Sequence, residues 1–402
     1  MKKPDLTLTR RNLLGAGSAV TLIFAAGVLW RAKERGVLGP APSDAYTPWD
    51  LWNATETKGT PLALVAAGIL SSSPHNTQPW IFHVSADRIE LYADTSRNLG
   101  AFDPYLREMH IGLGCAVETM VHAAGPNGYR VAVEAPTGNL LTLTDRKTPV
   151  LAAALALSPL SSPAEEDSLY QAIPMRHTNR HPYDRARGLP PSAKAIMADV
   201  AEEEGIQLYL FEDGQARTQF DEAVVAATEE IITDHEMVEA SSAWMRESSA
   251  DVLKYRDGLN FDTAGLAPWL TLAAKLLPSL PAEEGHKAWL DQTRNSQLPS
   301  APLTGFIAVR DRYDRAQSLA VGRVWARMQL TATALGFSMQ PVNQPIETVD
   351  RERQLGKESK SEARLTEITG DAAWQPTFAF RAGFPTTTCA ISPRRPLKSV
   401  VA

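Results

Sequence analysis

The chain has 402 residues, 44% of them hydrophobic and 21% charged, which is enough for a large core or for two domains. A formal net charge of −6 argues against nucleic-acid binding, because phosphate neutralisation needs a basic face. Cys115 and Cys389 are too few for a disulfide framework, and no CxxC pair or Cys/His cluster predicts a zinc site. One bridge between them stays possible, although two small buried apolar residues are the simpler expectation.

The N-terminus has the layout of an export signal. An apolar run over residues 13–30 follows four basic residues, Lys2, Lys3, Arg10 and Arg11. As a helix this run would span about 27 Å, so a transmembrane anchor is the alternative. Both interpretations can hold, because Ser43-Asp44-Ala45 is only a weak cleavage candidate. We separate residues 1–45 as signal or anchor plus linker, and the Pro-, Gly- and Ser-rich composition of residues 37–50 predicts a linker there. We expect an exported protein, either periplasmic or attached to the outer face of the cytoplasmic membrane.

The first half of the body is predicted to mix helices and strands. Periodicity predicts helices over 61–71 and 107–124 and strands over 81–84, 89–93, 129–135 and 139–143. Ala86-Asp87-Arg88 predicts a hairpin turn between the first two strands. The Ala- and Leu-rich residues from 150 predict a helix that ends in a Pro/Ser-rich stretch. We place the boundary between two halves, 46–165 and 166–402, in that stretch.

The second half repeats this plan in part. Its predicted helices are 191–204, 219–256, 268–277 and 316–335, and its predicted strands are 206–211, 305–310 and 377–383. Residues 240–300, which contain Trp244, Trp269 and Trp289, resemble an insertion in this half. They predict either a lid over the site or an ordinary apolar packing element.

Two helical segments echo one another. Aligning Gly112 of HIGLGCAVETMVHAAG with Gly322 of AVGRVWARMQLTATALG also pairs Ala116 with Ala326. Small residues four apart let two helices approach closely, as a central pair would need. The echo predicts an internal duplication, although buried helices are often Ala-rich and chance is the alternative.

A stiff polar loop follows the first predicted helix. Two prolines restrain a stretch rich in amides and hydroxyls, and its candidate ligand-binding residues are Ser73, Pro74, His75, Asn76 and Gln78. Because Asn and Gln each offer a donor and an acceptor, the loop suits a planar heterocycle. The alternative is a polar connection held by local side-chain caps.

A second motif suits a phosphate. Arg176 and Arg180 lie four residues apart with the Thr178 hydroxyl between them, and guanidinium groups match phosphate oxygens bidentately. The pair Arg394 and Arg395 near the C-terminus could close on the same anion. A solvated basic turn and a solvated tail are the alternatives.

These segments resemble the FMN-dependent nitroreductase family. SPHNTQPWIF resembles its PSxxNxQPW.F signature, RHTNR its RxS.R phosphate motif, and GRVWARMQLTATALG its central helix. FAFRAGFP with SPRRPL resembles its last strand and basic C-terminal segment. In a plain nitroreductase the phosphate motif comes first, whereas here it follows the loop. The N-terminal segment TRRNLL resembles a twin-arginine signal. This motif order and this N-terminus together resemble the Acg-like branch of the family, in which one chain mimics a nitroreductase dimer.

The resemblance implies an α+β, nitroreductase-like fold. Its central mixed or antiparallel sheet would be flanked by helices and duplicated internally as a single-chain pseudo-dimer. The first half would supply the loop and the second half the phosphate motif and tail, for one FMN per chain. Thr178 replaces the family's serine and keeps its hydroxyl.

The resemblance further implies hydride transfer from NAD(P)H through FMN to a nitroaromatic or quinone. No residue stands out as a catalytic acid or base. The alternatives are a non-catalytic exported protein that stores or sequesters flavin, and an exported scaffold that has lost it. Expected partners are a small redox substrate and, during export, the twin-arginine translocase. Membrane anchoring stays possible, and a monomer is expected. No Gly-rich dinucleotide motif follows a predicted strand, and no G-x-S-x-G elbow is present. The histidines lack the spacing of metal ligands, so we expect no metal.

Overall fold

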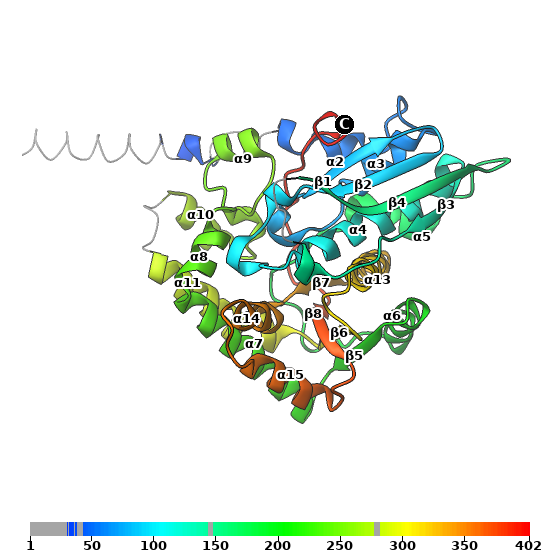
Figure 1. Ribbon diagram of the computed structural model, residues 1–402. Helices are drawn as coiled ribbons and strands as arrows, with labels where there is room; N and C mark the ends of the chain where they lie inside the picture. The colour runs from blue at the N-terminus through cyan, green and yellow to red at the C-terminus, as the bar shows by residue number, and fades with distance from the viewer. Residues whose placement is uncertain (1–29, 31, 36, 38–42, 144–147, 277–281) are drawn as a thin grey trace, which may run out of the picture.

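The protein is described here from a computed structural model that covers residues 30, 32–35, 37, 43–143, 148–276 and 282–402 (Figure 1). The predicted export signal lies outside the described residues, apart from Trp30 at the end of its apolar run. None of the helices in the described ranges combines the length and apolar character needed to cross a bilayer.

The first half builds an antiparallel sheet. Its strands are β1 (Trp80–Val84), β2 (Arg88–Ala93), β3 (Tyr129–Glu134) and β4 (Val150–Pro159), in the order β1-β2-β4-β3. Helices α3 (Pro61–Gly68) and α4 (Arg107–Ala124) precede and follow the β1–β2 hairpin. The hairpin and both helices confirm the sequence prediction. Residues 37–50 are not entirely a linker, because α2 (Thr47–Leu51) buries Trp49.

Two predictions in this half are wrong. The helix expected from residue 150 is strand β4, which pairs with β2 on one side and β3 on the other. Successive residues Ala152 to Leu155 are all buried, so both faces of this central strand are covered and no alternation marks it. Tertiary pairing thus overrides the helical propensity of Ala and Leu. The strand expected at 139–143 is a short 3-10 turn, Leu140–Thr142, which Asn139 caps.

The second half builds a sheet of the same order. Its strands are β5 (Gln207–Phe211), β6 (Leu303–Val309), β7 (Ser338–Pro341) and β8 (Gln375–Gly383), in the order β5-β6-β8-β7. Helices α6 (Pro191–Glu203) and α13 (Arg315–Ala334) take the places of α3 and α4. The sequence did not predict β7, nor the helices that follow it, α14 (Gln344–Gln354) and α15 (Lys360–Thr369).

An irregularity in strand pairing is repeated as well. The register between β2 and β4 shifts after Leu91 and passes over Ala152, and the register between β6 and β8 shifts after Ile307 and passes over Thr377. All pairs in both sheets are antiparallel. The α+β class is therefore confirmed, with two sheets of one topology, as an internally duplicated chain requires.

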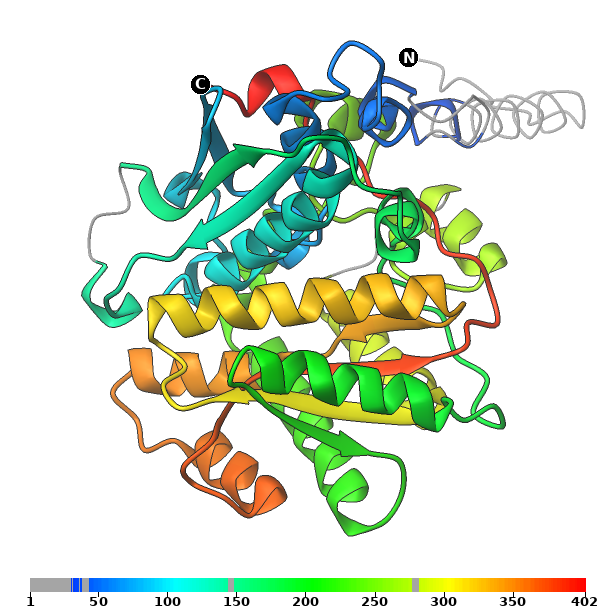
Figure 2. The ribbon, with the colours of Figure 1, turned by 90° about the vertical axis from the view of Figure 1, so that its right-hand side faces the viewer.

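The two halves meet through a central pair of helices, α4 and α13, which lie between the sheets (Figure 2). A Cβ atom at Gly322 would overlap the Ile111 carbonyl oxygen and lie 2.8 Å from the Gly114 Cα. Gly114 is thus the glycine that faces Gly322. Across the same contact Glu118 pairs with Arg323 at 2.9 Å and Arg327 at 2.6 Å.

A long insertion separates β5 from β6. It contains α7 (Gln215–Thr233), α8 (His235–Ser242), α9 (Ser249–Tyr255), α10 (Pro268–Leu276), α11 (Ala282–Gln292) and α12 (Leu298–Ser300). The continuous periodicity over 219–256 therefore becomes three helices. After β8 the chain crosses back to the first sheet, where the Phe82 N–H donates to the Val400 carbonyl at 2.7 Å (Figure 1). The C-terminal tail thus joins the two halves.

Buried carboxyl groups gather where the N-terminus of α4 meets α14. They surround Arg107, which pairs with Asp350 at 2.8 Å, and the others are Asp103, Glu108 and Glu347. Burial raises the pKa of Asp103 to about 6 and that of Glu108 to about 7. Burial and the neighbouring Glu108 raise the pKa of Glu347 well above its ordinary value.

Stability is expected to fall as pH rises from about 5 to about 8. These acids have higher pKa values in the folded chain than the values near 4 of an unfolded chain, so the unfolded chain ionises first. Their contribution is complete below about pH 4 and is lost as pH rises through 6 to 7. Glu347→Gln, which keeps a donor toward Glu108, should flatten this dependence. Urea midpoints of unfolding at about pH 5 and about pH 8 measure this dependence. Glu358→Gln, at an exposed residue, is the control. An equal loss of stability with pH in Glu347→Gln and Glu358→Gln would contradict the prediction.

Candidate functional site

The loop after α3 holds a strained conformation. His75, Asn76 and Gln78 have φ values of 46°, 55° and 50°, a left-handed region that side chains other than glycine rarely adopt. The Ser73 hydroxyl accepts the Gln78 N–H at 3.0 Å and fixes the turn. Pro74 packs against α4 at Gly112, where a Cβ would lie 2.9 Å from the proline ring. Such strain is typical of functional loops, because the surrounding structure must hold it in place.

Two arginines from distant segments meet beneath this loop. Arg176 follows the turn Ile173–Met175 and donates to the Leu70 carbonyl at 2.9 Å and to Gln329 at 3.3 Å. Arg394, in the returning tail, donates to the same Leu70 carbonyl at 3.1 Å and to the Asn76 amide oxygen at 2.7 Å. Two guanidinium groups therefore share one carbonyl at the end of α3.

These cations are buried without a carboxylate partner. Arg176 is 4% exposed and Arg394 is 2% exposed, and no ion pair found in the described part of the chain includes either of them or Arg180. Burial lowers the pKa of Arg176 to about 10. Burial and then the charge of Arg176 lower the pKa of Arg394 further. Buried charges of one sign are costly unless they are paired, so the cluster has the electrostatics of an anion site.

Two buried donors in this cluster lack an acceptor. The Arg394 Nε and the Gln329 side-chain nitrogen have no hydrogen-bond partner. Buried polar atoms in native proteins are nearly all hydrogen-bonded, and an orphan therefore points to a group that binds there. Donors of this kind fit the oxygens of a phosphate.

A small cavity lies at the cluster; we call it the arginine cavity. Its volume is about 40 Å³, and its lining is Ser72, Ser73, Asn76, Arg176, His177, Thr178, Arg180, Leu259, Thr263, Ala390, Ser392 and Arg394. Small-molecule sites usually measure about 300–1,000 Å³. The donor set therefore fits a phosphate, whereas the space left beside it does not fit a flavin ring.

Residues 256–263, which we call the covering segment, fill that space. The Asn76 amide donates to the Gly258 carbonyl at 3.2 Å, and the Gln78 amide donates to the Arg256 carbonyl at 2.8 Å. Arg180 donates to the Thr263 carbonyl at 3.1 Å. Amide and guanidinium groups that could hold a ligand are thus bound to the backbone of the insertion.

The structure brings most of the predicted site residues together. Those that line the arginine cavity are Ser73, Asn76, Arg176, Thr178, Arg180 and Arg394, and those that do not are Pro74, His75, Gln78 and Arg395. His75 instead bonds the Ser241 hydroxyl at 2.9 Å. Gln78 accepts the Arg395 backbone N–H at 2.8 Å. Sequence reasoning missed Gln329, although it stands in the helix segment that carried the resemblance.

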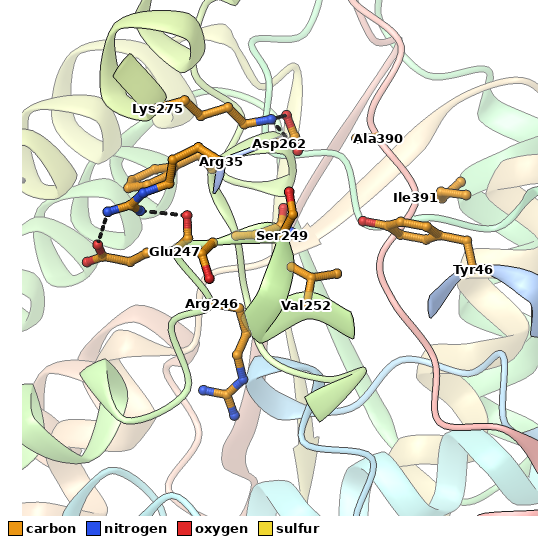
Figure 3. Close-up of a pocket in the computed structure, with 13 residues that line it drawn as sticks. Arg35, Tyr46, Arg246, Glu247, Ser249, Val252, Asp262, Lys275, Ala390 and Ile391 are labelled. Carbon is orange, nitrogen blue, oxygen red and sulfur yellow. Dashed lines mark hydrogen bonds and ion pairs between the residues drawn. The ribbon is translucent and has the colours of Figure 1, made fainter. Parts of the chain in front are cut away.

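A larger cavity of about 340 Å³ lies beyond the covering segment (Figure 3). Its lining is Arg35, Tyr46, Arg246, Glu247, Ser248, Ser249, Val252, Asn260, Phe261, Asp262, Lys275, Ala390 and Ile391. Leu259 and Thr263 line the arginine cavity, whereas the residues between them, 260–262, line this larger one. One turn of chain therefore separates the two cavities.

No cluster of His, Cys, Asp and Glu suited to a metal ion is found within the described ranges. Both cysteines are free thiols, so the possible bridge is absent. Cys115 is buried, as expected, but Cys389 is only partly buried.

Curated proteins with a similar sequence are known over most of this chain. The chain is 26% identical over 368 residues, 90% of its length, to "Putative NAD(P)H nitroreductase" proteins of Mycobacterium tuberculosis strains CDC 1551 / Oshkosh and ATCC 25618 / H37Rv, and the match covers 94% of each. No protein-family model matches the chain.

Solved structures with some likeness are also nitroreductases. A Desulfitobacterium hafniense nitroreductase with bound FMN gives a TM-score of 0.35 at 10% identity, covering 59% of this chain and 98% of its own. NfnB from Mycobacterium smegmatis, in complex with NADPH, gives a TM-score of 0.36 at 14% identity, and the match covers 58% of this chain and 97% of NfnB. A putative nitroreductase from Anabaena variabilis gives a TM-score of 0.41 at 11% identity, and the match covers 74% of this chain and 69% of that protein.

Proposed function

We propose that the chain is an FMN-binding oxidoreductase of the nitroreductase type, which takes hydride from NAD(P)H and passes it through FMN to a nitroaromatic or quinone. The observation that carries the proposal is the buried pair Arg176 and Arg394, which has no carboxylate partner in the described chain and shares one carbonyl. The similarity to proteins named NAD(P)H nitroreductases over 90% of the chain supports it.

Each residue then has a defined task. Arg176, Arg180 and Arg394 would hold the phosphate together with the Thr178 hydroxyl. The amides of Asn76 and Gln78 would hold the ring once they leave the covering segment. FMN, when bound, supplies the hydride acceptor and donor. The chain supplies binding, orientation and exclusion of water, and it needs no acid or base of its own for hydride transfer.

A second candidate is a non-catalytic protein that stores or sequesters flavin. The closed covering segment favours it, because the amides of Asn76 and Gln78 are bound to the Gly258 and Arg256 carbonyls and the arginine cavity measures only about 40 Å³. The segment would have to open to admit the flavin ring, and once closed over the ring it would shield the flavin from a nicotinamide.

One experiment separates these candidates. The purified full chain is expected to be yellow, with one FMN per chain, and to bleach when NADPH is added without oxygen. Two equivalents of FMN would contradict a single site built from both halves. Stoichiometric FMN that stays oxidised with NADH and NADPH would favour storage, and a colourless chain that takes up no added FMN would overturn both.

We also propose export as a folded monomer by the twin-arginine translocase, with attachment to the outer face of the membrane if the apolar run is retained. Support comes from the N-terminal sequence and from α10, which has no buried residue and exposes Trp269, Leu270 and Leu272. Exposed tryptophans and leucines suit a lipid interface. Fractionation of cells that express the full chain tests this, and recovery only in the cytoplasm would contradict it.

A further inference from the structure

We propose that the large cavity is a second binding site, which takes a neutral, planar molecule of the quinone class, separate from the arginine cavity. The identification of this ligand as an electron acceptor rests on the proposed function, whereas its binding does not. The cavity volume of about 340 Å³ lies within the usual range of small-molecule sites.

Every charged side chain that lines the large cavity is in an ion pair, and Arg246 shares its partner Asp257 with Arg97. Arg35 pairs with Glu247 at 2.8 Å, and Lys275 pairs with Asp262 at 2.6 Å. Arg246 pairs with Asp257 at 2.7 Å. A charged ligand would have to disrupt one of these pairs, whereas a neutral ligand leaves them intact. This is the opposite of the arginine cavity, where cations lie buried without an acid.

The remaining lining suits a flat ring with polar ends. Val252, Phe261 and Ile391 contribute apolar surface. Figure 3 shows Tyr46 and Ile391 on one side of the cavity, and Arg35 and Lys275 on the other. Burial, and then the charge of Asp262, raise the pKa of Tyr46 to about 12, so its phenol keeps its proton and can donate. A quinone presents two carbonyl acceptors at opposite ends of an apolar ring, and donors stand at both ends here.

The position of the cavity gives it a role. The turn Phe261–Thr263 and its preceding residue Asn260 form the wall between the two cavities, and Ala390 lines both. A ligand in the large cavity would therefore lie against the back of the covering segment that holds Asn76 and Gln78. Movement of that segment would join the two cavities.

The test measures binding of duroquinone, whose fully substituted ring resists thiol addition, by saturation-transfer NMR on the purified full chain. Ile391 is 39% exposed, so Ile391→Trp can narrow the cavity without disturbing the core. It is expected to weaken binding about tenfold or more. Tyr46→Phe is expected to weaken it about fivefold through loss of one hydrogen bond. Leu335→Trp, at a residue 47% exposed and outside the cavity, is the matched control and should leave binding unchanged.

The outcomes separate this site from the flavin. Binding should persist in Arg176→Ala, which removes a phosphate ligand on the other side of the wall, so failure of the proposed flavin site would leave this result standing. Absence of duroquinone binding, or equal binding by Ile391→Trp and the folded wild type, would overturn the proposal. Equal affinity for 2,4,6-trimethylbenzoate would overturn the argument that the site selects neutral ligands.

Discussion

Arg176→Ala is expected to lower the affinity for FMN by about 10- to 150-fold, because a hydrogen bond to a charged group contributes roughly 1.5–3 kcal/mol. Arg176 is buried beside Arg394, so a bound phosphate would compensate both charges at once. The measurement is FMN per chain after gel filtration, followed by a titration of the flavin-free chain with FMN.

Removing a buried arginine can also destabilise the chain, and a control must account for this. Arg312 is 1% exposed and pairs with Glu362 at 2.7 Å, far along the chain from the arginine cavity. Arg312→Ala should lower the thermal midpoint and yet retain FMN. Stoichiometric FMN in folded Arg176→Ala would remove that residue from the phosphate site.

The sequence was sufficient for elements whose pattern agrees with their environment. The β1–β2 hairpin and helices α4 and α13 fall where periodicity places them. It was insufficient for β4, because a central strand buried on both faces carries no alternation, and its alanines favour a helix locally. The duplication could be suspected from two helices, but the repeated strand order became visible only through pairing between distant segments.

The candidate site divides in the same way. Arg176, Thr178 and Arg180 form a local motif, and Asn76 lies in a loop with a readable signature. The covering segment carries no such signal, since its contribution is made by backbone carbonyls of Arg256, Gly258 and Thr263. Any sequence has carbonyls, so only the fold reveals which of them reach the site.

The covering segment also depends on close approaches that composition does not reveal. Gly265, at φ 75°, lies so near the Arg180 backbone that a Cβ would overlap it. Gly258, at φ 73°, does the same against the Trp244 carbonyl. The glycine at 265 thus lets the insertion lie against the phosphate motif, and the glycine at 258 lets two parts of the insertion approach each other. The same segment thus closes the arginine cavity and bounds the large cavity, so the proposed second site would be linked to flavin access.

Gly322→Ala is expected to destabilise the chain by about 3 kcal/mol or more, the upper end of what overpacking costs. Its Cβ would overlap the Ile111 carbonyl oxygen and lie 2.8 Å from the Gly114 Cα, and these backbone atoms cannot move aside as a flexible side chain could. The helices would have to separate, which would lengthen the contacts from Glu118 to Arg323 and Arg327. Because Arg176 reaches Gln329 on α13, weaker FMN binding should accompany the loss of stability.

Urea unfolding of Gly322→Ala and of the matched control Gly285→Ala measures this effect. Gly285 lies within helix α11, and a Cβ there meets no atom within 4 Å. Alanine is the better helix former by roughly 0.5–1 kcal/mol, so the control should be neutral or slightly stabilising. Opposite signs at the two glycines would identify the α4–α13 contact, rather than helix propensity, as the origin of the loss. If Gly322→Ala unfolded at the wild-type midpoint, the two halves would not depend on this close approach.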